Sequence, residues 1–198
     1  MRFHGVLEDL FGESARVAVL RVLLRFPGKS FSSTALAKEA KKSTPQTIKI
    51  LKKFQEIGVV KGTRVGKSDV WIFNQEHFLV KYLYPLEHAH LELQDFLARE
   101  FYEILPENKV SRLFLFGSVA TGGEKVKSDI DVLVIVKNEG DKNEIKDIIL
   151  GSSVKWVEKF GGNTIVPLVY SEKEFKEKRK SEFVREIEEK GIELELRK

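Results

Sequence analysis

A short glycine turn followed by two closely spaced aspartates constrains this chain more than any other feature of its sequence. Residues 113–116 and 132–136 are continuous apolar runs, which is the pattern of strands buried on both faces. Gly117-Ser118 follows the first run, and Asp129-Ile130-Asp131 opens the second. Side chains alternate between faces along a strand, so the sequence predicts that both carboxylates leave one face, with Cα atoms roughly 6–7 Å apart.

This arrangement predicts a site for a metal ion and a phosphate. Two carboxylates this close repel each other unless one is protonated or a cation joins them. A divalent ion that prefers hard oxygen ligands, such as Mg²⁺, is the natural partner of Asp129 and Asp131. Gly117 and Ser118 offer backbone N–H groups and a hydroxyl without bulk, which is how a chain approaches a phosphate.

The motif resembles a known family. Gly117-Ser118, ten residues, then Asp129-Ile130-Asp131 is similar to the signature of the polymerase-beta-like nucleotidyltransferases, and most similar to that of the small prokaryotic minimal nucleotidyltransferases. The resemblance runs from about residue 111 to residue 196. It implies a mixed sheet with helices that transfers NMP from an NTP to an acceptor with Mg²⁺. It also implies that Asp129 and Asp131 are catalytic and hold the metal, that Gly117 and Ser118 contact the β- and γ-phosphates, and that Lys127 adds positive charge near them.

Two positions depart from the family pattern. The family usually adds a third carboxylate from a neighbouring strand, which completes the metal site and helps to deprotonate the acceptor. Here the matching strand, residues 164–170, carries no acid, and Glu158 and Glu172 lie outside it. Thr121 stands where many relatives carry Arg. Nucleotide binding therefore follows more directly from the resemblance than turnover does.

The rest of the C-terminal region alternates strands with helices, which predicts an α/β arrangement. Pro167 inside a strand favours an edge position or a bulge. The expected elements are strands at 111–116, 129–136, 164–170 and 192–196, a short helix from Ser118, and helices at 143–160, 171–179 and 182–190.

The front of the chain reads as helices followed by a hairpin. Ser14 is a suitable cap for the second helix, and Pro45 suits the first turn of the fourth. The helices are expected at 6–11, 15–26, 34–40 and 44–58, and the strands at 59–61 and 70–73, joined by a basic, glycine-rich loop. This pattern resembles a winged helix-turn-helix, so the predicted fold class is a two-domain α+β or α/β chain.

That resemblance implies double-stranded DNA as a partner of residues 1–75, with the helix from Thr44 in the major groove. Residues 1–75 carry 14 Lys/Arg and 6 Asp/Glu, a net charge of +8, whereas residues 76–198 carry 20 and 24, a net charge of −4. The basic half fits a polyanion partner. Use of this domain only for dimerisation or protein contact stays open. The candidate base contacts are Gln46 and Thr47, and the candidate phosphate contacts are Lys42, Lys49, Lys52, Lys53, Arg64 and Lys67.

A helical stretch with a break at Pro85 joins the two regions. It is either the seam of a homodimer or a helix packed on its own chain, and the sequence favours neither. The predicted domains are a winged helix at 1–75, a helical connector at 76–108 and a nucleotidyltransferase-like domain at 109–198.

Composition limits the cell compartment and the kind of site. The chain has no cysteine, which excludes disulfides and thiolate metal sites. No apolar run approaches ~18 residues, so no membrane partner is expected, and the first residues lack a signal-peptide layout. A cytoplasmic protein is the expectation. The 32% of charged residues is also typical of a thermophile.

Two functions follow as hypotheses. The first is a Mg²⁺-dependent nucleotidyltransferase whose winged helix binds DNA and whose acceptor, a protein or another molecule, is unknown. The second is a transcription regulator whose degenerate nucleotidyltransferase domain binds a nucleotide without turnover. The intact Gly-Ser and Asp-x-Asp motif favours the enzyme, and the missing third acid favours the regulator.

Overall fold

The computed structural model describes residues 2–195, which form two compact units. The N-terminal unit comprises residues 5–88, and the C-terminal unit comprises residues 89–195 together with residues 2–4. The chain therefore passes between the units twice, after His4 and after His88. Among the described residues, no helix has the length and apolar character needed to cross a membrane.

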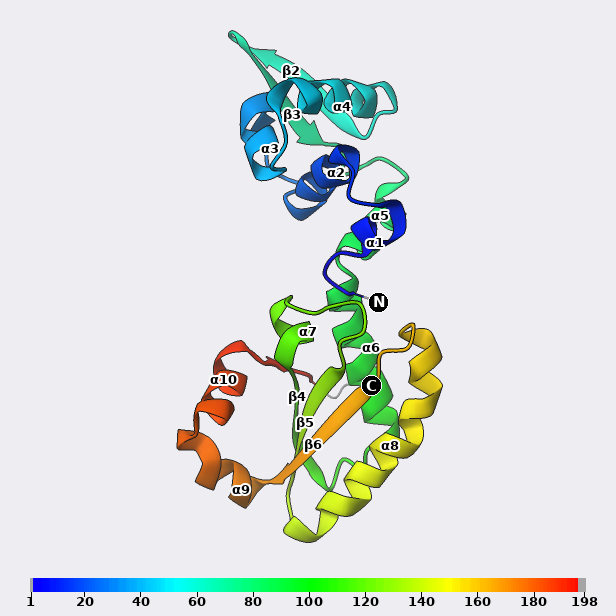
Figure 1. Ribbon diagram of the computed structural model, residues 1–198, viewed down its shortest axis with the longest axis vertical. Helices are drawn as coiled ribbons and strands as arrows, with labels where there is room; N and C mark the ends of the chain where they lie inside the picture. Colours follow the sequence, from blue (N-terminus) through cyan, green and yellow to red (C-terminus); the bar gives the residue numbers. More distant parts are fainter. Residues whose placement is uncertain (1, 196–198) are drawn as a thin grey trace. The chain divides into compact units, whose positions relative to one another are not determined.

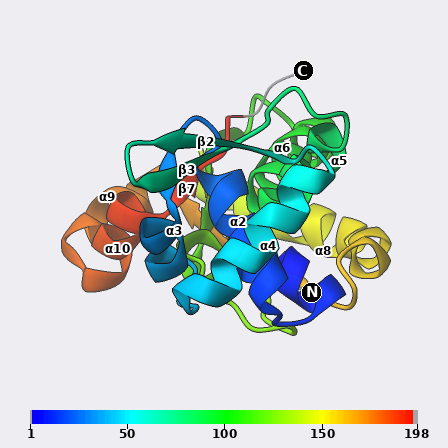
Figure 2. The ribbon, with the colours of Figure 1, turned by 90° about the horizontal axis from the view of Figure 1, so that it is seen from above.

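The N-terminal unit combines five helices with a small antiparallel sheet in the order β1-β3-β2. Figure 1 and Figure 2 show the long β2–β3 hairpin beside α4. Its strands run further than predicted, because their pairing continues to Val65 and Ser68 and leaves a two-residue turn. The elements are α1 (Val6–Phe11), α2 (Ala15–Arg25), β1 (Phe31–Ser32), α3 (Ser33–Glu39), α4 (Thr44–Glu56), β2 (Val60–Val65), β3 (Ser68–Phe73) and α5 (Val80–Glu87).

Local capping sets the helix starts in this unit. The Ser14 hydroxyl accepts a hydrogen bond from the backbone N–H of Val17 at 3.2 Å, as expected for the start of α2. Ser32 does the same for α3. Pro45 lies in the first turn of α4, where its missing N–H has no intrahelical role.

The predicted break at Pro85 is wrong. Pro85 lies inside α5, and the chain breaks at His88, before α6 (Ala89–Ile104). A proline removes one backbone donor, and the remaining bonds of the helix, including the one from His88 N–H to the Tyr84 carbonyl, hold it together. The stretch 76–108 is also not a separate connector, since α5 belongs to the N-terminal unit and α6 to the C-terminal unit.

The C-terminal unit is a four-stranded mixed sheet in the order β6-β5-β4-β7, with helices on both faces (Figure 1). Strands β5 and β6 are parallel, and the other pairs are antiparallel. Pro167 lies in β6 at the edge of the sheet, as its residue type predicts. The elements are β4 (Val110–Phe116), α7 (Gly117–Thr121), β5 (Ile130–Val136), α8 (Lys142–Lys159), β6 (Ile165–Ser171), α9 (Glu172–Glu177), α10 (Glu182–Lys190) and β7 (Ile192–Glu193). The end of the predicted last strand, residue 196, lies outside the described residues.

Strand β5 separates two apolar cores, which explains its continuous apolar run. Val132 and Val134 pack with α6 and α8 on one face. Leu133 and Ile135 pack with α9 and α10 on the other face. Because side chains alternate, Asp131 projects from the face that α9 and α10 cover.

Candidate functional site

The two aspartates of the motif lie at the start of the central strand β5. Asp129 precedes the strand and accepts a hydrogen bond from the Thr164 hydroxyl at 2.5 Å. Asp131 is the second residue of β5 and is half-buried. In the sheet register, Asp131 lies opposite Phe116 of β4 and Val166 of β6.

The electrostatics of this pair suit a divalent cation. Burial raises the pKa of the Asp131 carboxyl above its usual value, and the negative charge of Asp129 raises it further. A bound cation would offset both effects. Mg²⁺ is commonly held by one or two carboxylates together with substrate phosphates, so two acids are sufficient ligands from the protein. Among the described residues, no group of three or more His, Cys, Asp or Glu side chains is placed to hold a metal on its own.

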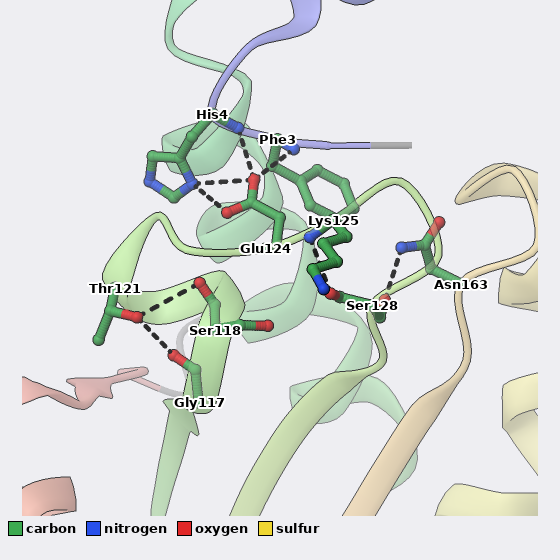
Figure 3. Close-up of polar contacts among 9 residues, drawn as sticks. All are labelled: Phe3, His4, Gly117, Ser118, Thr121, Glu124, Lys125, Ser128 and Asn163. Carbon is green, nitrogen blue, oxygen red and sulfur yellow. Dashed lines mark hydrogen bonds and ion pairs between the residues drawn. The ribbon is translucent and has the colours of Figure 1, made fainter.

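The glycine turn brings backbone against the Asp131 carboxylate. Gly117 has φ +73°, and a Cβ at this position would collide with the carboxylate oxygen of Asp131. The Thr121 hydroxyl donates to the carbonyl of Gly117 at 3.0 Å, with a longer contact of 3.4 Å to Ser118 (Figure 3). Thr121 thus stabilises the short helix that starts at the turn.

A buried glutamate in the motif loop was missed by the sequence analysis. The Glu124 carboxylate accepts hydrogen bonds from the backbone N–H groups of Phe3 and His4, each at 2.8 Å, and lies 3.1 Å from the Nδ1 atom of His4 (Figure 3). Burial acts to raise the pKa of Glu124, but the hydrogen bonds and the His4 ring outweigh burial and lower the pKa below its usual value. A glutamate among exposed lysines gives no signal of such a role.

Two further contacts fix the loop where it enters β5. The backbone N–H of Lys125 donates to the Ser128 hydroxyl at 2.9 Å, and the Asn163 amide donates to the Ser128 carbonyl at 2.6 Å. Figure 3 shows these contacts on the loop that leads to the aspartates. Lys127, predicted to add positive charge near the phosphates, is exposed on this loop.

The position beside Asp131 on the neighbouring strand is occupied by an apolar residue. Val166 pairs with Asp131 in the parallel register, so both side chains leave the same face, and Val166 is 44% exposed. Glu172 lies six residues further along the chain, roughly 20 Å away at 3.3 Å per residue. Glu158 is exposed on α8, which covers the opposite face. Neither glutamate supplies a third ligand.

The candidate DNA contacts of the N-terminal unit are exposed, with one exception. Thr47 is fully buried and forms the apolar face of α4 with Ile50, Leu51 and Phe54. The predicted base contact by Thr47 is therefore wrong. Ile57, just after the helix, is 58% exposed. The exposed candidates are Lys42, Gln46, Lys49, Lys52 and Lys53 on or beside α4, and Arg64 and Lys67 on the hairpin.

Comparisons with known structures give weak likenesses to one protein. A mutant of Lactococcus lactis ZitR in complex with DNA shares 18% identity over 46% of this chain and 62% of that chain, with a TM-score of 0.32. A second ZitR mutant, in apo form, shares 18% identity over 50% of this chain and 75% of that chain, with a TM-score of 0.33. The chain thus spans less than two thirds of the first of these proteins.

The family comparison covers the C-terminal unit. No curated protein matches the chain. The model of the nucleotidyltransferase domain matches residues 98–194, a range that includes α6 and begins before the predicted boundary at residue 109. This range contains both the glycine turn and the aspartate pair, so the C-terminal unit is similar to a nucleotidyltransferase domain.

Proposed function

We propose that the protein is a DNA-binding regulator whose nucleotidyltransferase domain binds a nucleoside triphosphate with Mg²⁺ and does not turn it over. The observation that carries this proposal is Val166 beside Asp131, in the place where a third carboxylate would stand. The pair of acids and the glycine turn support binding, and the valine argues against transfer.

The binding half of the proposal rests on complementary charges. Asp129 and Asp131 would hold Mg²⁺, and the backbone at Gly117 and Ser118 would contact the triphosphate. When bound, Mg²⁺ would neutralise phosphate charge and the mutual repulsion of the two carboxylates. The half-burial of Asp131 and the close packing of Gly117 against it keep this carboxylate in place without a ligand.

Transfer would require more than binding. The acceptor hydroxyl must lose its proton as it attacks, and a carboxylate on the face of the two aspartates is the group that could accept it. Val166 can neither accept a proton nor coordinate a second metal ion. Among residues of β6 on that face, Leu168 and Tyr170 pack into the apolar core.

The DNA half of the proposal rests on the exposed face of α4. Opposite its buried stripe this helix presents Lys49 and Lys52, with Gln46 near its N-terminus. The β2–β3 hairpin adds Arg64 and Lys67 at its tip. A helix that follows a short turn and is flanked by a basic hairpin can place its N-terminal side chains at base edges and its lysines at phosphates.

A nucleotidyltransferase that acts on an unknown acceptor is the second candidate, favoured by the intact aspartate pair. Calorimetry with Mg²⁺–ATP and label transfer from radioactive NTPs in cell extract separate the two. We expect Mg²⁺-dependent binding that is lost in Asp131→Asn, and no labelled acceptor. Label transfer by the wild type that vanishes in Asp131→Asn would establish the enzyme instead.

A gain-of-function variant sharpens this test. Val166→Asp places a carboxylate beside Asp131, and Val166→Asn gives a polar side chain of the same size without the charge. We expect Val166→Asp to bind Mn²⁺ at least tenfold more tightly than the wild type, because a third carboxylate adds a charged oxygen ligand. Equal Mn²⁺ affinity in both variants would show that Val166 does not face the metal site.

The DNA proposal is tested by the salt dependence of duplex binding. Each phosphate contact contributes about −0.9 to the slope of log K against log salt. Lys49→Ala with Lys52→Ala should therefore weaken binding and make the slope less negative by about 2. Lys29→Ala, in the loop after α2, is the control and should change neither the DNA affinity nor its salt dependence. Absence of binding to any duplex DNA would leave the N-terminal unit as a protein-contact domain.

A further inference from the structure

A cavity beside the glycine turn is not explained by metal or phosphate binding. It has a volume of about 350 Å³ and lies between the end of β4, α7 and α10. Its walls include Phe116, Gly117 and Ser118 on one side, and Phe183, Glu186 and Lys190 of α10 on the other. A cavity of about 300–1,000 Å³ with mostly apolar walls and a few polar groups is the size and character of a small-molecule site.

The cavity adjoins the candidate metal site through the sheet register. Phe116 pairs directly with Asp131, and both side chains project from the face that α10 covers. Gly117 and Ser118 belong to the cavity wall and to the phosphate turn at the same time. A ligand with its phosphates at this turn therefore has the cavity as its nearest neighbouring space.

The walls offer an aromatic surface rather than further phosphate donors. The rings of Phe116 and Phe183 meet edge to face, with centroids 5.6 Å apart and planes at 88°. Phe183 is 40% exposed, so part of its ring is free to stack on a flat ligand. At the rim, Glu186 and Lys190 form an ion pair at 3.0 Å and provide one acceptor and one donor.

We propose that this cavity binds the base of the nucleoside triphosphate, with Phe183 as the stacking residue. The proposal rests on the proposed function, because it takes the triphosphate to bind at Gly117 and Ser118. A nucleobase is flat, aromatic and edged with donors and acceptors, which matches a phenylalanine wall and a rim with one carboxylate and one ammonium group. Stacking on an aromatic side chain tolerates any base and adds affinity that the phosphates alone do not provide.

The experiment compares Mg²⁺–ATP with Mg²⁺–inorganic triphosphate by calorimetry on the full chain. If the base occupies the cavity, the wild type binds ATP at least tenfold more tightly than inorganic triphosphate. Phe183→Ala should remove most of that difference and leave the triphosphate affinity unchanged. Phe183→Leu, which keeps an apolar side chain and the packing of α10, should also remove most of the difference in affinity between ATP and inorganic triphosphate. Phe11→Ala removes another exposed phenylalanine, from α1, and should change neither affinity.

The outcomes separate the two proposals. Equal affinities for ATP and inorganic triphosphate, both lost in Asp131→Asn, would overturn base binding in the cavity and leave the metal and phosphate site standing. An ATP preference that persists in both Phe183 variants would also overturn it. If neither ligand binds the wild type, the proposed function fails and the cavity proposal fails with it.

Discussion

At the scale of single residues, Gly117 holds the site together because no other residue fits its place. Its φ of +73° is costly for any residue with a Cβ, and a methyl group there would collide with the Asp131 carboxylate. Gly117→Ala should lower the free energy of unfolding by about 2 kcal/mol or more, measured by urea denaturation. Gly123→Ala, six residues on, has ordinary φ and no neighbour closer than 3.9 Å, so it should be nearly neutral. Equal effects of the two substitutions would contradict this account.

Asp131 should destabilise the ligand-free protein as the pH rises. Its pKa is raised above the ordinary 3.8, first by burial and then by Asp129. Below the ordinary pKa the carboxyl is protonated in both the folded and the unfolded state. Between the ordinary and the raised pKa only the folded state keeps the proton, so stability falls with rising pH and stays lower above that window.

Asp131→Asn removes this pH dependence, and we expect the variant to have a higher Tm than the wild type at neutral pH without Mg²⁺. Melting curves from pH 3 to pH 7 measure the effect. Mg²⁺ should raise the Tm of the wild type and not that of the variant, since ligands stabilise only the state that binds them. A variant less stable than the wild type at neutral pH would show that Asp131 is stabilised by contacts rather than strained by its neighbours.

The residues of the site differ in how far the sequence determines them. Their spacing of two residues predicted that Asp129 and Asp131 lie close together, and the charge of Asp129 does raise the pKa of Asp131, because this proximity needs only the local chain. The sequence did not determine which residue of β6 lies beside Asp131, because the register between β5 and β6 is set by the packing of whole strands. The burial of Thr47 was not predictable either. A threonine is compatible with the buried or the exposed face of a helix, and which face it occupies depends on the core against which the helix packs.

At the scale of elements, the turn between α3 and α4 contains a residue whose backbone conformation is unfavourable for its type. Lys41 has φ +52°, the only positive φ at a non-glycine position among the described residues. Lys42 N–H bonds to the Ala37 carbonyl, and Lys41 N–H to the Lys38 carbonyl, which is the hydrogen-bond pattern of a helix end that favours glycine at this place.

Lys41→Gly should therefore stabilise the N-terminal unit by about 1 kcal/mol, because it removes the steric cost of the left-handed conformation. Lys42→Gly, at the next position with negative φ, should destabilise the unit slightly through added freedom of the unfolded chain. Chemical denaturation followed by circular dichroism measures both. A stabilising Lys42→Gly together with a neutral Lys41→Gly would refute the explanation.

The bounds of a helix or strand were predictable where residues close in the sequence determine its ends. The bounds of α1 agree with the predicted residues, and α2, α3, α4, α8 and α10 agree within two residues, because caps, glycines and apolar spacing act over a few residues. The hairpin was predicted too short, since strand pairing extends through polar residues once the register is set. The break near Pro85 was misplaced, because the cost of one lost hydrogen bond does not decide whether a helix ends.

At the scale of the whole molecule, residues 2–4 belong to the C-terminal unit and not to the N-terminal unit that follows them in the chain. Phe3 packs among the rings of its core and meets Phe160 edge to face, with ring centroids 5.9 Å apart. His4 stacks on His90 at 4.2 Å, so the two places where the chain passes between units are in contact within the C-terminal unit. Glu124 ties this segment to the loop that carries Asp129.

Glu124 should accordingly be one of the most sensitive surface-loop positions in the protein. Glu124→Ala leaves the buried backbone N–H of Phe3 and the partly buried N–H of His4 without their acceptor, and we expect it to lower the free energy of unfolding by about 2–4 kcal/mol. Because the pKa of Glu124 is lowered, its stabilisation is complete above the ordinary value of 4.5 and is lost as the pH falls through the lowered pKa. Wild type and variant should therefore differ most at neutral pH and converge in acid.

Glu144→Ala is the matched control. Glu144 pairs with Lys109 at 2.5 Å on the surface of the same unit, and exposed ion pairs contribute little to stability. Urea denaturation at pH 7 and at pH 3 measures the C-terminal unit when it is followed by tryptophan fluorescence in a Trp71→Phe background, which leaves the buried Trp156 as the reporter. If Glu124→Ala is as mild as Glu144→Ala at pH 7, residues 2–4 do not anchor the motif loop. If the two glutamate variants differ at pH 7 and the Glu124 difference narrows at pH 3, the loop that positions the aspartates depends on the segment at the start of the chain.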